Sequence, residues 1–596
     1  MPKALQQDLP VWNLCDLYDG VDDPNLQKDL DQQLEAAAAF TQAYQHTIAT
    51  GALSAAHFKA ALDDYEALSR NAMKPLAFAQ LLFSTNTQDP KHGALLQRVR
   101  EAASSINTHL VFFELEIGKI PQAVFDALIG DAALKDYAHY LTTTHNKASH
   151  HLSEPEEKIL VETSNARGPA FVRLFSEIQS RTTYDVRRDG ELHVLTQSDV
   201  LALLYDADRQ VRAQAAEALS EGLRENAHAV TFIYNTLIHE KHVLDRLRGF
   251  ALPESERHLD NEIDQQAVDT MTEVCVANFD VVGEYYDLKR TLLGLDELTH
   301  YDRYAPVGNA SKKFSFPEAK QLVLEAFSGF DPRLGQMAEP FFSQRWIHAA
   351  IVEGKNSGAF CAGVTPDVHP YVFVNYTHTI NDVMTLAHEL GHGVHDVLAA
   401  HNHMLDYQPA LPLAETASTF GEMLVFDHLL SQLDDDRDKL QLLCGKIENL
   451  FATVFRQVGI FRFERRAHQL RREQGELPTE AYNELWQETQ QDMFGASLKL
   501  GQDHACWWLY IPHIIQLPFY VYAYAFGELL VLSLYARYRE EGAGFIDNYF
   551  KLLAAGGSKS PAQLVTEMGF DIADAAFWQA GCNLIRQRLE QAKALL

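Results

Sequence analysis

The stretch from Thr385 to His395 constrains this chain most, because it contains His-Glu-x-x-His at His388, Glu389 and His392. Residues four apart on an α-helix share one face about one turn apart, so two imidazoles at this spacing can bind one divalent ion. The intervening Glu389 can reach a metal-bound water. Because the bare pattern is not rare in a chain this long, the assignment depends on a third ligand.

The flanking residues predict that the motif lies on a helix. Apolar residues recur at roughly helical spacing, at Ile380, Val383, Met384, Ala387, Leu390 and Val394. We expect Asn381 to cap this helix, with Asp382 in its first turn. Gly391 and Gly393 each cost about 1 kcal/mol relative to Ala inside a helix. We interpret both glycines as room for a packed neighbour or for substrate close to the backbone.

The third ligand is predicted in the segment 413–422. A catalytic zinc takes three protein ligands and keeps one position open. Glu415 follows His392 by 23 positions (415 − 392), which leaves room for a loop and a second, antiparallel helix. Glu422 lies on the same helical face as Glu415, so we expect Glu415 to bind the metal and Glu422 to orient a ligand imidazole. If Glu415 instead serves a helix N-terminus, His403 is the substitute ligand.

Two motifs carry a resemblance to a known family. The sequence HELGHGVH at 388–395, followed by AETASTFGE at 414–422, resembles the zinc oligopeptidases related to thimet oligopeptidase, and most closely the oligoendopeptidase F family of bacteria. The resemblance implies that His388, His392 and Glu415 bind one Zn2+ per chain. It gives Glu389 the role of general base. It also implies a deep cleft that admits short flexible peptides and excludes folded proteins.

An aromatic segment near the C-terminus adds to the functional prediction. His513, Tyr520, Tyr522 and Tyr524 supply imidazole and hydroxyl donors, and peptide hydrolysis needs such donors because a negative oxygen develops on the scissile carbonyl. The resemblance implies substrate binding and transition-state stabilisation for His513, Tyr522 and Tyr524. The spacing is shifted by one residue from the thimet-like pattern, so Tyr520 is an alternative to either tyrosine. Aromatic core packing is the other interpretation.

The rest of the chain predicts a mostly α protein with two domains. Amphipathic helices fill most of the first part, and a hairpin is expected between Thr182 and Leu195, with a tight turn at Asp189-Gly190. We place the boundary there, which gives a helical N-terminal domain at 1–195 and a helical catalytic domain at 196–596.

A small β-sheet is expected beside the zinc helix. The stretch 355–363 is punctuated by glycines, and the run Tyr371–Tyr376 is rich in residues that favour strands. An edge strand in this sheet offers a place for an extended peptide substrate to pair. The alternative is that Tyr371–Tyr376 is simply a packed strand.

Composition limits the partners and the compartment. The formal net charge of −31 argues against nucleic acid or an anionic membrane surface as a partner. No apolar run reaches the roughly 18 residues that span a membrane, and the first ten residues lack a signal pattern. The six cysteines are scattered without a C-x-x-C pair, which fits a reducing cytoplasm. The sequence does not indicate the oligomeric state.

These inferences together predict a zinc-dependent endopeptidase that hydrolyses internal bonds of short oligopeptides. Glu389 would accept a proton as water attacks and pass it to the leaving amine. A carboxypeptidase or a dipeptidyl carboxypeptidase of related fold could use the same zinc ligands. A non-catalytic peptide-binding protein with an inactive metal site is disfavoured, because the three predicted ligands and the predicted general base are all present.

Overall fold

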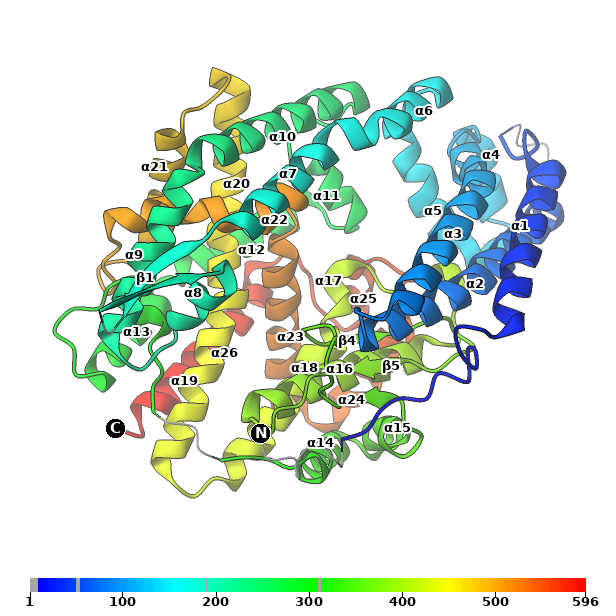
Figure 1. The fold of residues 1–596 in the computed structure, drawn as a ribbon. Helices are drawn as coiled ribbons and strands as arrows, with labels where there is room; N and C mark the ends of the chain where they lie inside the picture. Colours follow the sequence, from blue (N-terminus) through cyan, green and yellow to red (C-terminus); the bar gives the residue numbers. More distant parts are fainter. Residues whose placement is uncertain (1–8, 50–53, 189, 309–311) are drawn as a thin grey trace. The chain divides into compact units, whose positions relative to one another are not determined.

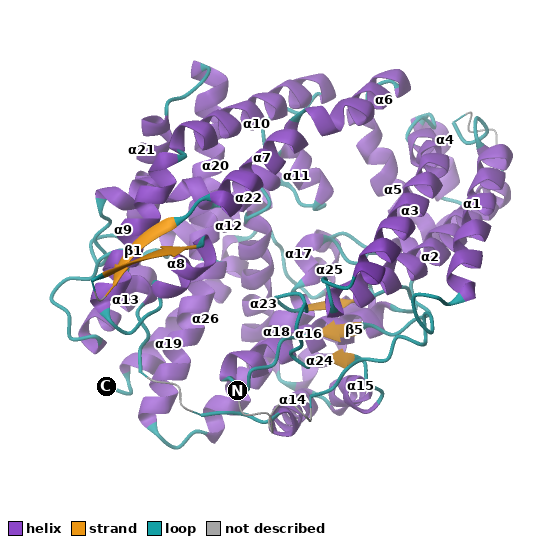
Figure 2. Cartoon of the chain, viewed as in Figure 1, coloured by secondary structure: helices purple, strands orange, loops and turns teal. Residues whose placement is uncertain are grey.

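The computed structural model describes residues 9–49, 54–188, 190–308 and 312–596. Helices form most of this part of the chain and the strands are short (Figure 2), which confirms the mostly α prediction. Contacts divide the chain into two compact units, each assembled from three segments. Unit 1 comprises Met1–His151, Lys312–Gln432 and Arg537–Gly569, and unit 2 comprises Leu152–Ser311, Leu433–Ala536 and Phe570–Leu596. The domain boundary predicted near residue 195 divides the chain into two consecutive stretches, and it stays a prediction.

Three long helices open unit 1. They are α1 (Pro24–Tyr44), α2 (Ala55–Thr85) and α3 (Pro90–Ile117). The side chains of Asp23, Ser54 and Asp89 accept backbone N–H groups at the three helix starts, which satisfies donors that a helix leaves unpaired. The helices pack against one another (Figure 1) and bury a core that includes Phe40 and Phe113. Shorter helices follow, namely α4 (Gln122–Ile129), η1 (Ala132–Tyr137), α5 (Ala138–Lys147) and η2 (Ala148–His150).

The small sheet of unit 1 has the strand order β3-β5-β4. Its strands are β3 (Ile347–His348), β4 (Phe360–Ala362) and β5 (Tyr371–Phe373). Strand β5 is central and buried, parallel to β3 and antiparallel to β4. The sheet therefore forms where it is expected, with Tyr371–Phe373 as its packed strand and β4 at an edge. Trp12 packs on this sheet, with its ring centroid 5.6 Å from that of Phe373.

The remaining helices of unit 1 surround the His-Glu-x-x-His motif. They are α14 (Phe316–Phe330), α15 (Pro332–Ser343), α16 (Ile380–Ala399), η5 (Met404–Asp406), α17 (Leu411–Ala414), α18 (Thr416–Gln432), α24 (Ala543–Ala554) and α25 (Pro561–Glu567). The motif lies on α16, as predicted. Helix α16 packs along α18 and also contacts α15, α24 and the sheet.

The start of α16 differs from the prediction. Thr379 caps the helix in place of Asn381, and it forms a capping box with Asp382. The Asp382 carboxylate also accepts a hydrogen bond from the backbone of Thr377 at 2.9 Å. The prediction of Asn381 was wrong because Thr379 Oγ1 and Asp382 satisfy each other's backbone N–H, an arrangement that a cap two residues later would not give.

Unit 2 is also built mainly of helices. They are α6 (Glu154–Thr163), η3 (Ser164–Ala166), α7 (Gly168–Arg181), α8 (Gln197–Leu203), α9 (Arg209–Glu225), α10 (Ala227–Arg248), α11 (Ser255–Asp260), α12 (Gln265–Ala277), α13 (Asp280–Leu292), η4 (Asp302–Tyr304), α19 (Asp436–Thr453), α20 (Phe455–Gln474), α21 (Thr479–Phe494), η6 (Gln502–Tyr510), α22 (Pro512–Gln516) and α26 (Ala575–Lys593). Helix α23 (Tyr522–Glu541) begins in unit 2 and ends in unit 1.

The hairpin of unit 2 confirms the prediction for residues 182–195. Strands β1 (Tyr184–Arg188) and β2 (Glu191–Leu195) pair antiparallel, with Tyr184 opposite Leu195 and Arg188 opposite Glu191. Asp189 of the predicted turn lies outside the described residues. In the part of the chain that the structure describes, no helix combines the length and the apolar character needed to cross a bilayer.

Candidate active site

Three side chains converge at the contact between α16 and the start of α18. His388 and His392 lie one turn apart on α16, and Glu415 is the single residue between α17 and α18. Glu415 Oε2 lies 3.2 Å from His388 Nε2 and 3.4 Å from His392 Nε2. The hydroxyl of Ser418 donates to the same carboxylate oxygen at 2.6 Å, which fixes its orientation. The sequence prediction of a second helix returning past the motif is therefore matched by this geometry.

Glu422 approaches His388 from the other side of its ring. Its Oε2 lies 3.6 Å from His388 Nδ1, while Nε2 of the same imidazole faces Glu415. A carboxylate beside Nδ1 favours the tautomer that carries its proton there and leaves Nε2 able to bind a metal. Glu422 thus lies where a residue that orients a ligand imidazole is expected.

Glycine allows α16 and α18 to approach closely enough for this geometry. A Cβ atom on Gly391 would lie 2.4 Å from the carbonyl oxygen of Ala417 and 2.5 Å from Cα of Ser418. A Cβ atom on Gly393 would lie 2.5 Å from the ring of Phe341. Both glycines therefore make room for packed neighbours, which is the first of the two interpretations drawn from the sequence.

The charges of the three converging groups depend on one another. Burial alone lowers the pKa of His388, but the carboxylates of Glu415 and Glu422 overcome this and raise it to about 10. Burial alone raises the pKa of Glu415, but the two imidazoles lower it well below its usual range. The carboxylate is thus held in its charged form, which is the form that binds a cation.

Glu389 is buried beside the three converging groups, with 6% of its surface exposed. Burial raises its pKa above the usual range, although the neighbouring His388 and His392 act in the opposite direction. The backbone of Cys361, on edge strand β4, hydrogen-bonds to the Glu389 carboxylate. A buried carboxylate with a raised pKa suits a group that accepts and returns a proton near neutral pH.

The donor set fits a catalytic zinc site. The ligand atoms of His388, His392 and Glu415 all lie within 4.8 Å of one another. Two imidazole nitrogens and one carboxylate oxygen are a ligand set used by catalytic zinc, with a fourth position left for water or substrate. The substitute ligand His403 is engaged elsewhere, because its Nδ1 lies 3.1 Å from Glu66 Oε2 and its ring stacks on Tyr137.

The four candidate residues of the aromatic segment belong to unit 2. His513, Tyr520 and Tyr524 group together, with ring centroids of His513 and Tyr524 5.9 Å apart and those of Tyr520 and Tyr524 5.0 Å apart. Tyr522 is separate from this group and fully buried.

The hydroxyl of Tyr522 has partners inside unit 2. It lies 2.9 Å from His258 Nδ1 and accepts a hydrogen bond from Asn261 Nδ2 at 2.8 Å. Neither partner was singled out from the sequence, since each lies more than 250 positions from Tyr522 and no local pattern links them. His258 and Asn261 thus satisfy the hydroxyl of Tyr522 within unit 2. By contrast, the side chains of His513, Tyr520 and Tyr524 are half-buried.

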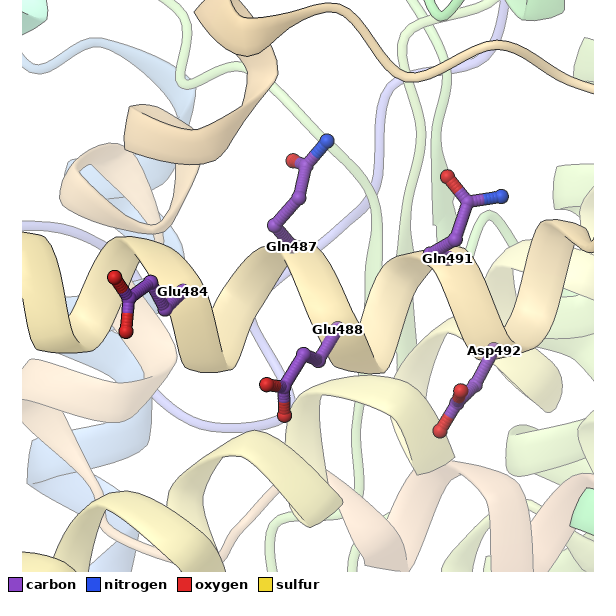
Figure 3. Close-up of a pocket in the computed structure, with 5 residues that line it drawn as sticks. All are labelled: Glu484, Gln487, Glu488, Gln491 and Asp492. Atoms are coloured by element: carbon purple, nitrogen blue, oxygen red, sulfur yellow. The ribbon is translucent and has the colours of Figure 1, made fainter.

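A shallow hollow on unit 2 offers no comparable chemistry. Figure 3 shows the side chains that line it, all from helix α21: Glu484, Gln487, Glu488, Gln491 and Asp492. Glu488 accepts from Arg466 at 2.7 Å and Asp492 accepts from Arg462 at 3.0 Å, so two of its three carboxylates are already neutralised. The hollow has neither an imidazole nor a nucleophile.

Comparisons with known proteins agree with this site. The profile of Peptidase family M3 matches residues 202–584, which include both metal motifs, and the profile of Oligopeptidase F matches residues 116–184. An oligoendopeptidase F homolog of Borreliella burgdorferi is 27% identical over 90% of this chain and 91% of its own length. The oligopeptidase PepF of Bacillus subtilis is 26% identical over 83% of this chain and 74% of its own length.

Solved structures share the fold. A chain from Chlamydophila abortus matches with a TM-score of 0.89 and 23% identity, covering 98% of both chains. The oligoendopeptidase F of Enterococcus faecium matches with a TM-score of 0.70 and 21% identity, covering 96% of this chain and 97% of its own. Because the M3 profile spans more than half of the sequence and contains the converging His388, His392 and Glu415, the chain belongs to Peptidase family M3.

Proposed function

We propose that this M3 peptidase is a zinc-dependent endopeptidase that cuts internal bonds of short oligopeptides. The observation that carries the proposal is the convergence of two imidazole nitrogens and one carboxylate oxygen, with a buried carboxylate beside them. The family and the names of the relatives, oligoendopeptidase F and oligopeptidase PepF, support the substrate class.

His388, His392 and Glu415 would hold the zinc ion, one per chain. When bound, the ion supplies a Lewis acid that activates water and polarises the carbonyl of the scissile bond. Glu422 holds the His388 ring from its Nδ1 side, and Ser418 holds the Glu415 carboxylate. The ligands are thus fixed before substrate arrives, which reduces the reorganisation needed during the reaction.

Glu389 carries the proton in this mechanism. Its carboxylate accepts a proton from the attacking water, and its burial raises its pKa, which makes it a stronger base. It then returns this proton to the leaving amine. His513 with Tyr524, and Tyr520 or Tyr522 as the second tyrosine, would donate hydrogen bonds to the substrate and to the developing oxyanion. The grouping of His513, Tyr520 and Tyr524 favours Tyr520 over Tyr522 for this role.

Peptides with blocked ends test the endopeptidase assignment. We expect the zinc-loaded protein to cleave an internally quenched peptide that is acetylated at one end and amidated at the other, and to lose this activity on chelation. A carboxypeptidase or dipeptidyl carboxypeptidase would cleave only the version with a free C-terminus. Mass spectrometry of the fragments separates the two, and zinc content that tracks activity during reconstitution identifies the metal.

We also propose a cytoplasmic location and peptide partners, on the basis of charge and cysteine chemistry. The six cysteines are free, and four of them are buried, as expected for a protein of a reducing cytoplasm. The net charge of −31 leaves peptides, rather than nucleic acid or anionic membranes, as the partners we propose.

A further inference from the structure

Two arginines of unit 2 lack an acidic partner. Arg303 lies in η4, and Arg456 is the second residue of α20. Among the described residues, no Asp or Glu comes within ion-pairing distance of either guanidinium. Arg303 is 8% exposed, and its Nε has no hydrogen-bond partner. Burying a charge without a counter-ion costs desolvation free energy. An anion from outside the chain would offset this cost.

Two carboxylates of the neighbourhood are already paired with other cations. Asp302 accepts hydrogen bonds from Arg209 at 2.8 Å and from Arg212 at 2.9 Å. Glu448 accepts a hydrogen bond from the ammonium of Lys289 at 2.6 Å.

Phenol groups lie between the two arginines. The guanidinium of Arg303 lies 4.4 Å from the ring centroid of Tyr304 and donates to its hydroxyl. Tyr304 hydrogen-bonds to Tyr510, and Tyr510 hydrogen-bonds to Arg456. Burial alone raises the pKa of Tyr304, but the two arginines lower it below its usual range.

This group is continuous with the proposed substrate-binding residues of unit 2. His513 follows Tyr510 by three residues, across the extended Ile511 that separates η6 from α22. Burial, and then the positive charge of Arg456, lowers the pKa of His513. His513 in turn belongs to the group with Tyr520 and Tyr524. His513 thus lies within the electrostatic influence of Arg456, and all of these residues belong to one unit.

We propose that Arg456, with the hydroxyls of Tyr510 and Tyr304 and the charge of Arg303 behind them, binds a carboxylate of the peptide substrate. The proposal rests on the function proposed above. Guanidinium and carboxylate form two parallel charge-assisted hydrogen bonds, and phenols can add further ones. The carboxylate comes from the C-terminus of a short peptide or from an Asp or Glu side chain, and the experiment distinguishes the two.

The experiment compares three quenched peptides of one uncharged sequence. The first has a free C-terminal carboxylate, the second a C-terminal amide, and the third a C-terminal amide and one internal Glu. For the zinc-loaded wild type we expect one of the two acidic peptides to have a kcat/KM about 10-fold or more above that of the amide, at low ionic strength. Arg456→Gln should remove this preference by raising KM for the acidic peptide, with little change in kcat for the neutral one.

Matched variants separate binding from general charge effects. Arg466→Gln removes a positive charge from the same helix, but this side chain is paired with Glu488, so the preference should stay. Arg456→Lys keeps the positive charge but lacks the planar guanidinium group, so it should retain part of the preference that Arg456→Gln loses. Direct binding of the acidic peptide to Glu389→Gln protein, with and without Arg456→Gln, gives the same comparison without turnover. Thermal unfolding of each variant checks that the fold is intact.

The outcomes separate this proposal from the proposed function. Loss of the preference in Arg456→Gln supports the carboxylate site, and the peptide that shows it identifies the carboxylate. If the wild type cleaves all three peptides and Arg456→Gln leaves their ratios unchanged, the carboxylate site is overturned while the peptidase assignment stands. If the wild type cleaves none of them, the proposed function fails first.

Discussion

Two carboxylates act on opposite nitrogens of the His388 ring, and their roles differ. Glu415 lies at Nε2 of both His388 and His392, whereas Glu422 lies at Nδ1 of His388. We therefore propose Glu415 as a ligand and Glu422 as the group that fixes the ring. Removing a carboxylate of the second kind leaves the ligands in place but lets the ring rotate and change tautomer.

The first prediction concerns Glu422. Glu422→Ala should lower zinc affinity about 10- to 100-fold, because the His388 ring loses its orienting partner. A competitive chelator titration measures this affinity. Glu325→Ala is the matched control, since it removes a carboxylate beside His428 on an exposed part of unit 1. Equal affinities for wild type and Glu422→Ala would contradict the role given to Glu422.

The second prediction concerns Glu389. Glu389→Gln should retain zinc, since none of the three ligand atoms changes, and should lower kcat by about 100- to 10,000-fold, the contribution typical of a positioned general base. Peptide turnover and metal content of the same preparation measure the two effects. Near-normal turnover in a zinc-loaded Glu389→Gln protein would remove Glu389 from the mechanism.

At the scale of elements, the approach of α16 to α18 sets the metal geometry. Gly391 faces the backbone at Ala417 and Ser418, and Glu415 lies two residues before Ala417. A side chain at position 391 would therefore push back the segment that carries the third ligand. Stability and metal binding depend on the same contact.

The third prediction follows from this contact. Gly391→Ala should lower the free energy of unfolding by about 1–3 kcal/mol, the usual range for overpacking, and should weaken zinc binding in parallel. Gly445→Ala on α19 is the matched control, because its Cβ would meet nothing within 4 Å. There the gain in helix propensity should stabilise the protein by up to about 1 kcal/mol. Denaturant unfolding and chelator titration compare the variants, and unchanged zinc affinity in Gly391→Ala would separate the two effects.

At the scale of the whole molecule, one buried carboxyl group makes stability depend on pH. Glu464 on α20 is fully buried and accepts a hydrogen bond from the backbone of Phe519 at 3.0 Å, where Phe519 has a φ of 59°. Burial raises the pKa of Glu464 to about 8. In the unfolded chain the pKa of a glutamate is about 4.3.

The fourth prediction is that the wild type loses stability as the pH rises. The folded state holds the Glu464 proton more tightly than the unfolded chain does. This proton therefore contributes its full stabilisation below the pKa that Glu464 has in the unfolded chain. The stabilisation is lost as the pH rises through the pKa that Glu464 has in the folded state. Relative to Glu464→Gln, the wild type should lose about 1.4 kcal/mol of unfolding free energy per pH unit between about pH 5 and pH 8. Urea unfolding across this range measures the difference, with Glu488→Gln as an exposed control. A difference that does not vary with pH would show that Glu464 does not titrate on folding.

Local sequence was sufficient for the helices and for the metal motif. The helix carrying His388 and His392 follows from apolar periodicity and the spacing of two imidazoles, and both are properties of neighbouring residues. Glu415 was predicted as the third ligand because its distance from His392 in the sequence leaves room for a loop and a returning helix. The hairpin at 184–195 and the sheet strand at 371–373 likewise rest on short-range patterns.

Tertiary structure decided the features that join distant parts of the sequence. The hydroxyl of Tyr522 meets His258 at a separation of 264 positions, and no periodicity encodes such a pairing. Arg303 and Arg456 likewise act through Tyr304 and Tyr510, which only folding brings together. Local sequence is enough to indicate which residues can bind a metal and which segments are helical, because hydrogen bonds and side-chain spacing within a helix are local. The fold decided which donors are buried, paired or left free, because burial and electrostatic potential depend on every neighbour in space.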